Sequence, residues 1–238
     1  MSLFPDLVAQ RGASVAGIAL RCCDVADLLR EVRGAKLVIA DPPWQYSQSP
    51  GVANPEENDI FAGLSDPEIV AHLDATFDCA GPDARLAVWY TFPKDQEWSE
   101  AGNAGKRWGG RTSGGAWIKS PHVGVGYHWR GWVEPVALFT KGTTGRPNHT
   151  AGTGLFGNGH ISAPDEHSYK PVAWMRRWIR AWTDPGDLVL DVYAGLGSVA
   201  VACALEGRRY VGAEIDPERH RRAGLRVADE VERAQLSA

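Results

Sequence analysis

The sequence predicts an α/β fold in which a mostly parallel sheet carries helices on both faces. Three short apolar runs, at 35–40, 188–191 and 209–214, are bounded by glycine, proline or charged residues, as buried strands are. Segments that suit helices alternate with such runs, most clearly in the last third of the chain. Alternating strands and helices favour parallel pairing, because each helix returns the chain to the same edge of the sheet.

In the first part of the chain we expect strands at 16–20, 35–40 and 85–92 and one clear helix. Ser65 is expected to be the N-cap of that helix, because Pro67 suits a first turn and Glu68 can complete a capping box. The helix should run to about Phe77. The strand at 35–40 must stop at Pro42, since proline cannot donate to a sheet ladder. A buried strand therefore delivers Asp41 to its C-terminal tip.

The remaining elements are expected as strands at 116–119 and 133–140, a helix at 171–182, a strand at 188–191, a helix at 198–206, a strand at 209–214 and a helix at 217–234. The region 95–166 is rich in glycine and basic residues, and we expect it to be rich in loops and to contact the substrate. We find no internal repeat, so the 238 residues are expected to form one domain.

Composition and charge exclude several classes of protein. Hydrophobic residues make up 44% of the chain, yet no apolar run approaches the roughly 20 residues of a membrane helix, so a soluble protein is expected. The first residues lack the pattern of a secretory signal, which favours the cytoplasm. A net charge of −4 argues against an evenly basic surface but allows a local basic patch. Most of the ten tryptophans are expected to be structural.

The cysteines predict neither a zinc site nor a disulfide framework. Cys22, Cys23, Cys79 and Cys203 show no C-x-x-C spacing and no nearby histidine cluster. None of them follows a proline, as the nucleophile of a cytosine C5 methyltransferase usually does. We therefore expect no metal and no cysteine nucleophile.

The strongest cofactor signal follows the strand at 188–191. There the chain enters a Gly-x-Gly turn formed by Gly195 and Gly197, and a helix begins at Ser198, which is the context in which a nucleotide can approach the backbone. Glu214 ends the next strand, where an acid can accept hydrogen bonds from ribose hydroxyls. The third glycine of dinucleotide sites is absent, which disfavours a nicotinamide oxidoreductase. The alternative is that these residues only allow tight packing.

The tetrapeptide Asp41-Pro42-Pro43-Trp44 carries groups that suit chemistry at an aromatic amine. The exocyclic amino group of adenine is a poor nucleophile, because its lone pair is delocalised into the ring. The Asp41 carboxylate and the Pro42 carbonyl can accept its two N–H groups, and the two prolines fix the chain and remove competing donors. Trp44 offers a flat face on which a base can stack. By itself, the tetrapeptide could equally be an ordinary turn after a strand.

At these residues the sequence resembles the S-adenosylmethionine-dependent amino-methyltransferases, where D-P-P-W or D-P-P-Y after a strand is the catalytic motif for adenine N6. The tetrapeptide precedes the glycine turn, which matches the circularly permuted, β-type order. The tryptophan variant and the segments 126–134 and 139–142 are similar to the branch that includes the eukaryotic mRNA adenine methyltransferases, and to phage and bacterial orphan DNA adenine methyltransferases. The resemblance runs from about Leu20 to Arg222 and implies a Rossmann-like fold.

The resemblance also implies a cofactor, S-adenosyl-L-methionine, and the residues that bind it. Asp24 would accept a hydrogen bond from the adenine of the cofactor, and Lys170, in an H-x-x-K-P element at 167–171, would approach the cofactor. The full implied set is Cys23, Asp24, Val25, Asp41, Lys170, Asp191, Gly195, Gly197, Ser198 and Glu214. Without the resemblance, Asp24 would be read as a helix cap and Lys170 as a solvated charge.

The chain departs from the family pattern in the glycine turn. Val192-Tyr193 replaces the usual Pro-Phe, and Leu196 and Val199 replace Ser and Thr, which leaves the glycines intact but puts the hydroxyl contact at the helix start in doubt. Glu134 lies in a strand-like run, and we interpret it as structural, holding the loop that follows the tetrapeptide.

The function predicted is methylation of adenine N6 in DNA. Cytosine N4 enzymes use similar geometry but often begin the motif with serine, so Asp41 favours adenine. The gap 142–166, where related enzymes place a target-recognition domain, has about 25 residues, which predicts a short or relaxed target sequence. Substrate contacts are expected at Trp44, Tyr46, Lys119 and Arg130. The alternatives are an RNA adenine methyltransferase and an inactive nucleic-acid-binding scaffold. The expected partner is nucleic acid, with DNA favoured over RNA; no membrane partner is expected, and a homodimer is left open.

Overall fold

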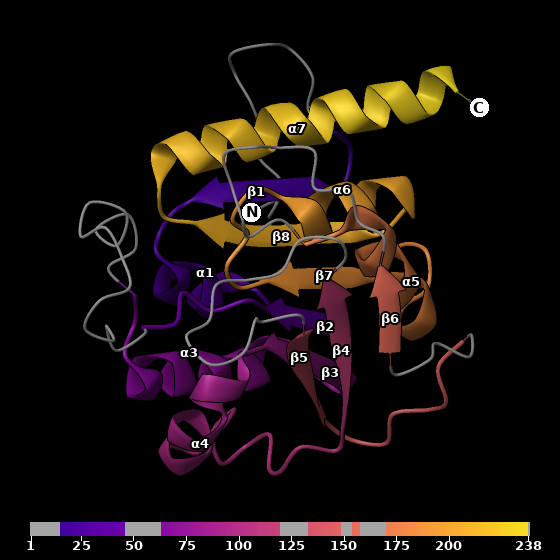
Figure 1. The fold of residues 1–238 in the computed structure, drawn as a ribbon. Coiled ribbons are helices and arrows are strands. Elements are labelled where there is room, and N and C mark those ends of the chain that lie inside the picture. Colours follow the sequence, from indigo (N-terminus) through magenta and orange to yellow (C-terminus); the bar gives the residue numbers. More distant parts are fainter. Residues whose placement is uncertain (1–14, 46–62, 120–132, 149–153, 158–169, 238) are drawn as a thin grey trace.

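The computed structural model describes residues 15–45, 63–119, 133–148, 154–157 and 170–237. Its eight strands form one sheet in the order β1-β8-β7-β2-β3-β5-β4-β6 (Figure 1). The strands are β1 (Ile18–Cys22), β2 (Ala35–Ala40), β3 (Ala80–Trp89), β4 (Ser113–Lys119), β5 (Val133–Thr140), β6 (Gly154–Gly157), β7 (Leu188–Asp191) and β8 (Arg209–Glu214).

Most of the sheet is parallel, as the sequence predicts. The five strands β1, β8, β7, β2 and β3 run in one direction, so their C-terminal ends share one edge. β5 is antiparallel to both β3 and β4, and β6 is parallel to β4. Consequently the start of β5 and the ends of β4 and β6 lie at the same edge as the C-terminal ends of the parallel strands.

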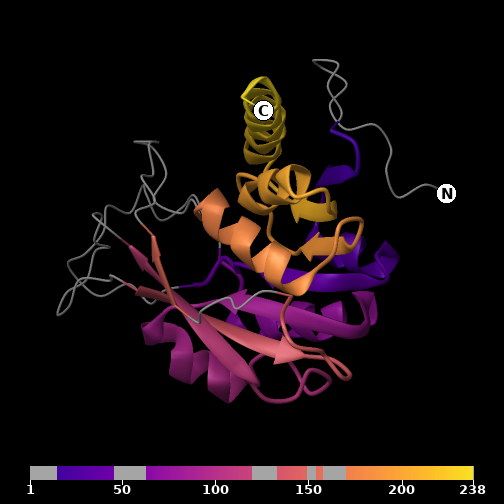
Figure 2. The same cartoon turned by 90° about the vertical axis from the view of Figure 1, so that its right-hand side faces the viewer.

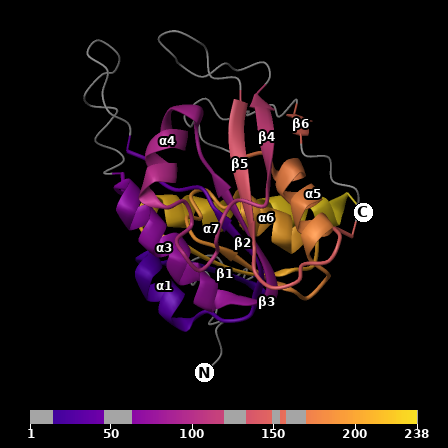
Figure 3. The ribbon, with the colours of Figure 1, turned by 90° about the horizontal axis from the view of Figure 1, so that it is seen from below.

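Helices cover both faces of the sheet (Figure 3). On one face lie α1 (Val25–Glu31), α3 (Asp66–Cys79) and α4 (Phe92–Ala101), and on the other lie α5 (Val172–Trp182), α6 (Ser198–Leu205) and α7 (Pro217–Leu236). Strand residues alternate between two buried cores: Val38 and Val88 face the first group of helices, and Leu37 and Trp89 face the second. The α/β prediction is therefore confirmed.

The second core explains most of the tryptophan content. Trp89 packs edge-on against Trp174, with ring centroids 5.0 Å apart, and Trp174 and Trp178 lie 4.8 Å apart. The apolar α6 lies beside this cluster, between α5 and α7 (Figure 2). Seven tryptophans are buried in the described part of the chain: Trp44, Trp89, Trp98, Trp108, Trp117, Trp174 and Trp178. The prediction that most tryptophans are structural is confirmed.

Local sequence signals predicted most helices and strands correctly, and the wrong predictions have physical reasons. The Ser65–Glu68 capping box is present and α3 begins at Asp66. The strand expected to end at Phe92 ends at Trp89, because Thr91 is the N-cap of the helix α4 and Pro93 lies in its first turn. Within the region 95–166, the residues that the structure describes include most of α4 and the strands β4, β5 and β6.

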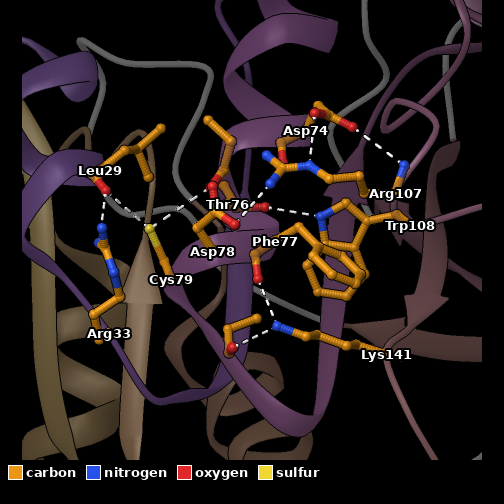
Figure 4. A network of polar contacts seen from close by, with 12 residues as sticks. Leu29, Arg33, Asp74, Thr76, Phe77, Asp78, Cys79, Arg107, Trp108 and Lys141 are labelled. Atoms are coloured by element: carbon orange, nitrogen blue, oxygen red, sulfur yellow. Dashed lines mark hydrogen bonds and ion pairs between the residues drawn. The ribbon is translucent and has the colours of Figure 1, made fainter.

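A polar network ties α3 to the loop that follows α4 (Figure 4). Arg107 donates to the Asp74 and Asp78 carboxylates at 2.9 and 2.7 Å, and Lys141 donates to the Phe77 carbonyl at 2.7 Å. These residues lie near the start of β3 and the end of β5, which is the sheet edge opposite the C-terminal ends of the parallel strands. Arg107 and Lys141 are therefore engaged within the fold at this opposite edge.

Candidate active site

The C-terminal ends of β7 and β2 meet at the centre of the sheet, where the chain order reverses. From β7 the chain continues to β8 on one side, and from β2 it continues to β3 on the other. Ile39 pairs in register with Asp191, so the tetrapeptide and the glycine turn leave the sheet side by side. Open α/β sheets bind ligands at such a switch point. The two predicted motifs, about 150 residues apart in sequence, therefore share one site.

At the tip of β2, Asp41 forms an ion pair with Lys170. The Lys170 Nζ lies 2.6 Å from Asp41 Oδ2 and 3.2 Å from Glu134 Oε2, at the start of β5. The lysine side chain is only 10% exposed, and its ammonium lies 5.9 Å from the centre of the Trp89 ring. The structure thus excludes the interpretation of Lys170 as a solvated charge and gives Glu134 a charged partner that the sequence did not predict.

The three groups carry one net negative charge. Burial by itself would lower the pKa of Lys170, but the neighbouring Asp41 and Glu134 carboxylates outweigh burial and raise the pKa well above its ordinary value. Lys170 is therefore a permanent ammonium at neutral pH. Two carboxylates against one ammonium give these three groups a net negative charge, which suits a cationic ligand or an amine that gains positive charge.

The turn formed by the tetrapeptide is closed by short-range contacts. The Trp44 N–H donates to the Pro42 carbonyl at 2.9 Å, and the Leu64 N–H donates to the Pro43 carbonyl at 3.0 Å. A carbonyl has two lone pairs, so Pro42 keeps the capacity for a second hydrogen bond. A Cβ at Gly63 would lie 2.8 Å from the Pro43 oxygen, which is why the residue beside this turn must be glycine.

Trp44 is part of the core rather than an open platform. It is 8% exposed, its indole N–H donates to the Trp89 carbonyl at 3.0 Å, and it packs edge-on against Trp98 at 5.4 Å. Neighbouring side chains therefore cover most of the face that we expected to stack on a base. The contacts make Trp44 an anchor of the Asp41 turn, and stacking on a base stays a prediction.

The glycine turn has the backbone shape that the sequence predicts. Gly195 and Gly197 adopt φ angles of +52° and +76°, a region that favours glycine, and Gly197 is the N-cap of α6. A Cβ at Gly197 would come within 3.3 Å of the Ala223 Cβ on α7. Ser198, expected to contact the cofactor, is 9% exposed and accepts a hydrogen bond from Arg226 at 3.1 Å.

Acidic side chains flank the turn at the ends of β8 and β1. Glu214 accepts from the Asp216 N–H at 2.9 Å and its side chain is 11% exposed. The Cys23 N–H donates to the Glu214 carbonyl, so the segment 23–25 lies directly beside β8. Asp24 is the N-cap of α1 and accepts from the Ala26 N–H at 2.7 Å through Oδ1. The helix-cap interpretation of Asp24 is therefore correct, while the second carboxylate oxygen leaves it capacity as an acceptor.

Asp191 lies behind the turn and is 2% exposed. Burial raises its pKa to about 7, although the Tyr210 hydroxyl opposes this rise by donating to Asp191 Oδ2 at 3.0 Å. The carboxyl group thus supports the turn from within the core. Its predicted contact with a cofactor stays a prediction.

Two features of this edge were missed by sequence reasoning. Tyr193, which replaces the phenylalanine of the family pattern, hydrogen-bonds His72 on α3 at 3.0 Å. Burial lowers the pKa of His72 and raises that of Tyr193. Ile215, directly after Glu214, is 67% exposed. An exposed large apolar residue beside a polar turn is a candidate ligand contact. The sequence does not show which residues are exposed, so this signal could be found only in the structure.

Two of the four predicted substrate residues lie outside the described part of the chain. Tyr46 and Arg130 lie outside it, and the backbone of Lys119 ends β4 at the edge that carries Asp41. Arg111 is engaged with Asp95 at 2.7 Å and with Tyr90, so it too is used within the fold. In the described ranges, no helix is long and apolar enough to span a membrane, and no three His, Cys, Asp or Glu residues group as a metal site.

Comparison with known proteins identifies the family. The model of the DNA methylase family N6_N4_Mtase matches residues 95–224, more than half of the chain, and the chain therefore belongs to this family. The matched range holds the glycine turn, Glu134, Lys170 and Glu214 but not Asp41.

Two Escherichia coli K12 relatives match shorter stretches. The chain is 43% identical over 59 residues to a putative methylase, YubD, and 40% identical over 60 residues to the DNA adenine methyltransferase YhdJ. Each match covers 25% of this chain, and the matches cover 26% and 20% of these relatives. The chain thus aligns with about a quarter or less of their length.

Solved structures share the fold over most of the chain. The M1.HpyAVI–SAM complex matches with a TM-score of 0.66 at 16% identity, covering 88% of this chain and 98% of that one. The cytosine-N4-specific PvuII DNA methyltransferase matches with a TM-score of 0.65 at 14% identity, covering 91% and 94%. At such identities the likeness establishes the methyltransferase fold alone.

Proposed function

We propose that this chain transfers a methyl group from S-adenosyl-L-methionine to the N6 amino group of adenine in DNA. The observation that carries the proposal is the meeting of Asp41 with the glycine turn at the switch point of the sheet, inside a chain of the DNA methylase family. The family supplies the reaction class and the polymer. The aspartate that begins the tetrapeptide supplies the preference for adenine.

The residues at the edge fit this cofactor. Gly195 and Gly197 leave the backbone open to a ligand, Glu214 is placed to accept from ribose hydroxyls, and Ile215 offers an apolar surface for a flat ring. S-adenosyl-L-methionine supplies an activated methyl group on a sulfonium, whose positive charge the anionic Asp41–Lys170–Glu134 cluster complements. We propose that the glycine turn, Glu214, Ile215, the Asp41–Lys170–Glu134 cluster and the segment 23–25 together hold the cofactor.

In the proposed reaction Asp41 accepts an N–H of the target amine and so raises the electron density on its nitrogen. The Pro42 carbonyl is the second acceptor, and the closed turn fixes both oxygens before the substrate arrives. The attacking nitrogen would gain positive charge as its bond to the methyl group forms and the methyl–sulfur bond breaks. The nearby carboxylates would stabilise that charge until the nitrogen releases one proton. Neither a covalent nucleophile nor a proton transfer to a buried cysteine is needed.

One experiment separates the proposed function from its rivals. The purified chain would be incubated with tritiated S-adenosyl-L-methionine and with DNA and RNA in separate reactions, followed by digestion to nucleosides. We expect label in N6-methyladenine from DNA. Label in N4-methylcytosine would contradict the assignment of adenine, label from RNA alone would contradict the polymer, and no label with either would favour a nucleic-acid-binding scaffold.

The variant Asp41→Asn tests the residue at the centre of the proposal. The amide retains the shape but loses the charge, so we expect methyl transfer to fall by at least about a hundredfold. Asp229→Asn, at an exposed position on α7, is the matched control and should keep full activity. Full activity of Asp41→Asn, with both variants folded by circular dichroism, would refute the role of Asp41.

A further inference from the structure

Glu134 reaches the proposed catalytic centre from a different part of the chain. It stands at the start of β5, two strands away from β2 in the sheet, and its side chain is 15% exposed. Glu134 and Asp41 share Lys170, whose ammonium lies 2.6 Å from the Asp41 carboxylate and 3.2 Å from the Glu134 carboxylate. Three separate elements therefore converge on one buried charge, above the Trp89 ring.

Neutralising the buried ammonium requires only one carboxylate, and Asp41 already provides it at the shorter distance. The second carboxylate adds a net negative charge to the site. An ammonium shared by two carboxylates also withdraws less charge from each of them than it would from a single partner. The acceptor strength of Asp41 toward an amine therefore depends on whether Glu134 is present.

We propose that Glu134 is a positioning residue for methyl transfer, which shares the Lys170 ammonium with Asp41 and so keeps Asp41 a strong acceptor for the target amine. This proposal rests on the proposed function, because it assigns to Asp41 the task of accepting from that amine. It replaces the interpretation of Glu134 as a residue that only holds a loop.

The test compares Glu134→Gln with Glu206→Gln. Glu206 is a suitable control because its side chain is 9% exposed and pairs with two basic residues, Arg176 at 2.5 Å and Arg180 at 3.6 Å. It follows α6 at the sheet edge opposite Asp41. Both variants lose a buried carboxylate, so both can lose stability, and only Glu134→Gln should alter the centre.

Two measurements are made on both variants. In single-turnover methyl transfer, Glu134→Gln should lower the rate about tenfold, the size typical of losing a partner behind a reacting group, while cofactor affinity measured by calorimetry stays within about twofold. In nuclear magnetic resonance of protein labelled at its six lysines, the Lys170 titration should move to lower pH in Glu134→Gln, because one of two anionic partners is gone. Glu206→Gln should match the wild type in both.

Glu134→Asp keeps the negative charge, so its methyl-transfer rate should be higher than that of Glu134→Gln. If Glu134→Gln does not fold, Glu134→Asp is compared with the wild type instead. Combining Glu134→Gln with Lys170→Gln should cost no more than Lys170→Gln alone, since Glu134 acts through the lysine. An unchanged rate in folded Glu134→Gln, or an unmoved Lys170 titration, would overturn the proposal. Label in a nucleoside other than N6-methyladenine would instead refute the proposed function, and the rate comparison would still decide the role of Glu134.

Discussion

Asp191 gives the fold a dependence on pH that can be measured without any substrate. Its carboxyl group is 2% exposed, and burial raises its pKa from the ordinary value of 3.8 to about 7. Because the folded-state pKa is the higher one, the protonated form stabilises the fold. This contribution is complete below the unfolded pKa and is lost as the pH rises through about 7.

The magnitude follows from the two pKa values. Because of the linkage between ionisation and folding, ionisation of Asp191 should lower the free energy of unfolding, relative to a group that stays neutral, by about 2 kcal/mol at pH 5 and about 4 kcal/mol at pH 8. Asn at position 191 stays neutral and can still accept from Tyr210. The free energy of unfolding of Asp191→Asn should therefore rise, relative to the wild type, by roughly 2–3 kcal/mol between pH 5 and pH 8.

The assay is urea unfolding followed by tryptophan fluorescence, for wild type and variant at both pH values. Asp229→Asn, exposed on α7, controls for the chemical change and should differ little from the wild type at either pH. The free energies of unfolding of Asp191→Asn and the wild type are compared at each pH. If their difference is the same at pH 5 and pH 8 within about 0.5 kcal/mol, the assigned ionisation of Asp191 is wrong.

Three further substitutions test the site. Gly63→Ala would place a Cβ 2.8 Å from the Pro43 oxygen, so it should displace the turn and lower the methyl-transfer rate about tenfold, with cofactor affinity unchanged by calorimetry. Glu214→Gln weakens an acceptor for ribose hydroxyls and should raise the cofactor dissociation constant about tenfold while leaving the melting temperature nearly constant; an unchanged constant would count against the assignment. Trp44→Phe removes the indole donor to the Trp89 carbonyl and should lower the free energy of unfolding by about 1–3 kcal/mol in urea titration, whereas no loss would mean that water replaces the bond.

Much of the fold was predictable because its signals are local. The bounds predicted for β2, β5, β7 and β8 agree with the structure, since each strand is an apolar run stopped by glycine, proline or charge. The capping box of α3 lies within four residues, and so could be found from the sequence. The helix α4 was not predicted, because Phe92 continues the apolar run of β3, and β6 was not predicted because four residues carry too little pattern.

The sequence by itself determined which chemical groups arrive at the ends of strands: the carboxylate of Asp41, the glycines before α6 and the acid that ends β8. Only the tertiary structure decided which of these groups meet. Lys170 pairs with an aspartate 129 positions earlier, and Glu134 shares that lysine from another strand. Burial also makes Trp44 an anchor of the Asp41 turn and raises the pKa of Asp191 to about 7. Ion pairing and desolvation depend on distances between residues far apart in the chain, and these distances are set by packing rather than by local pattern.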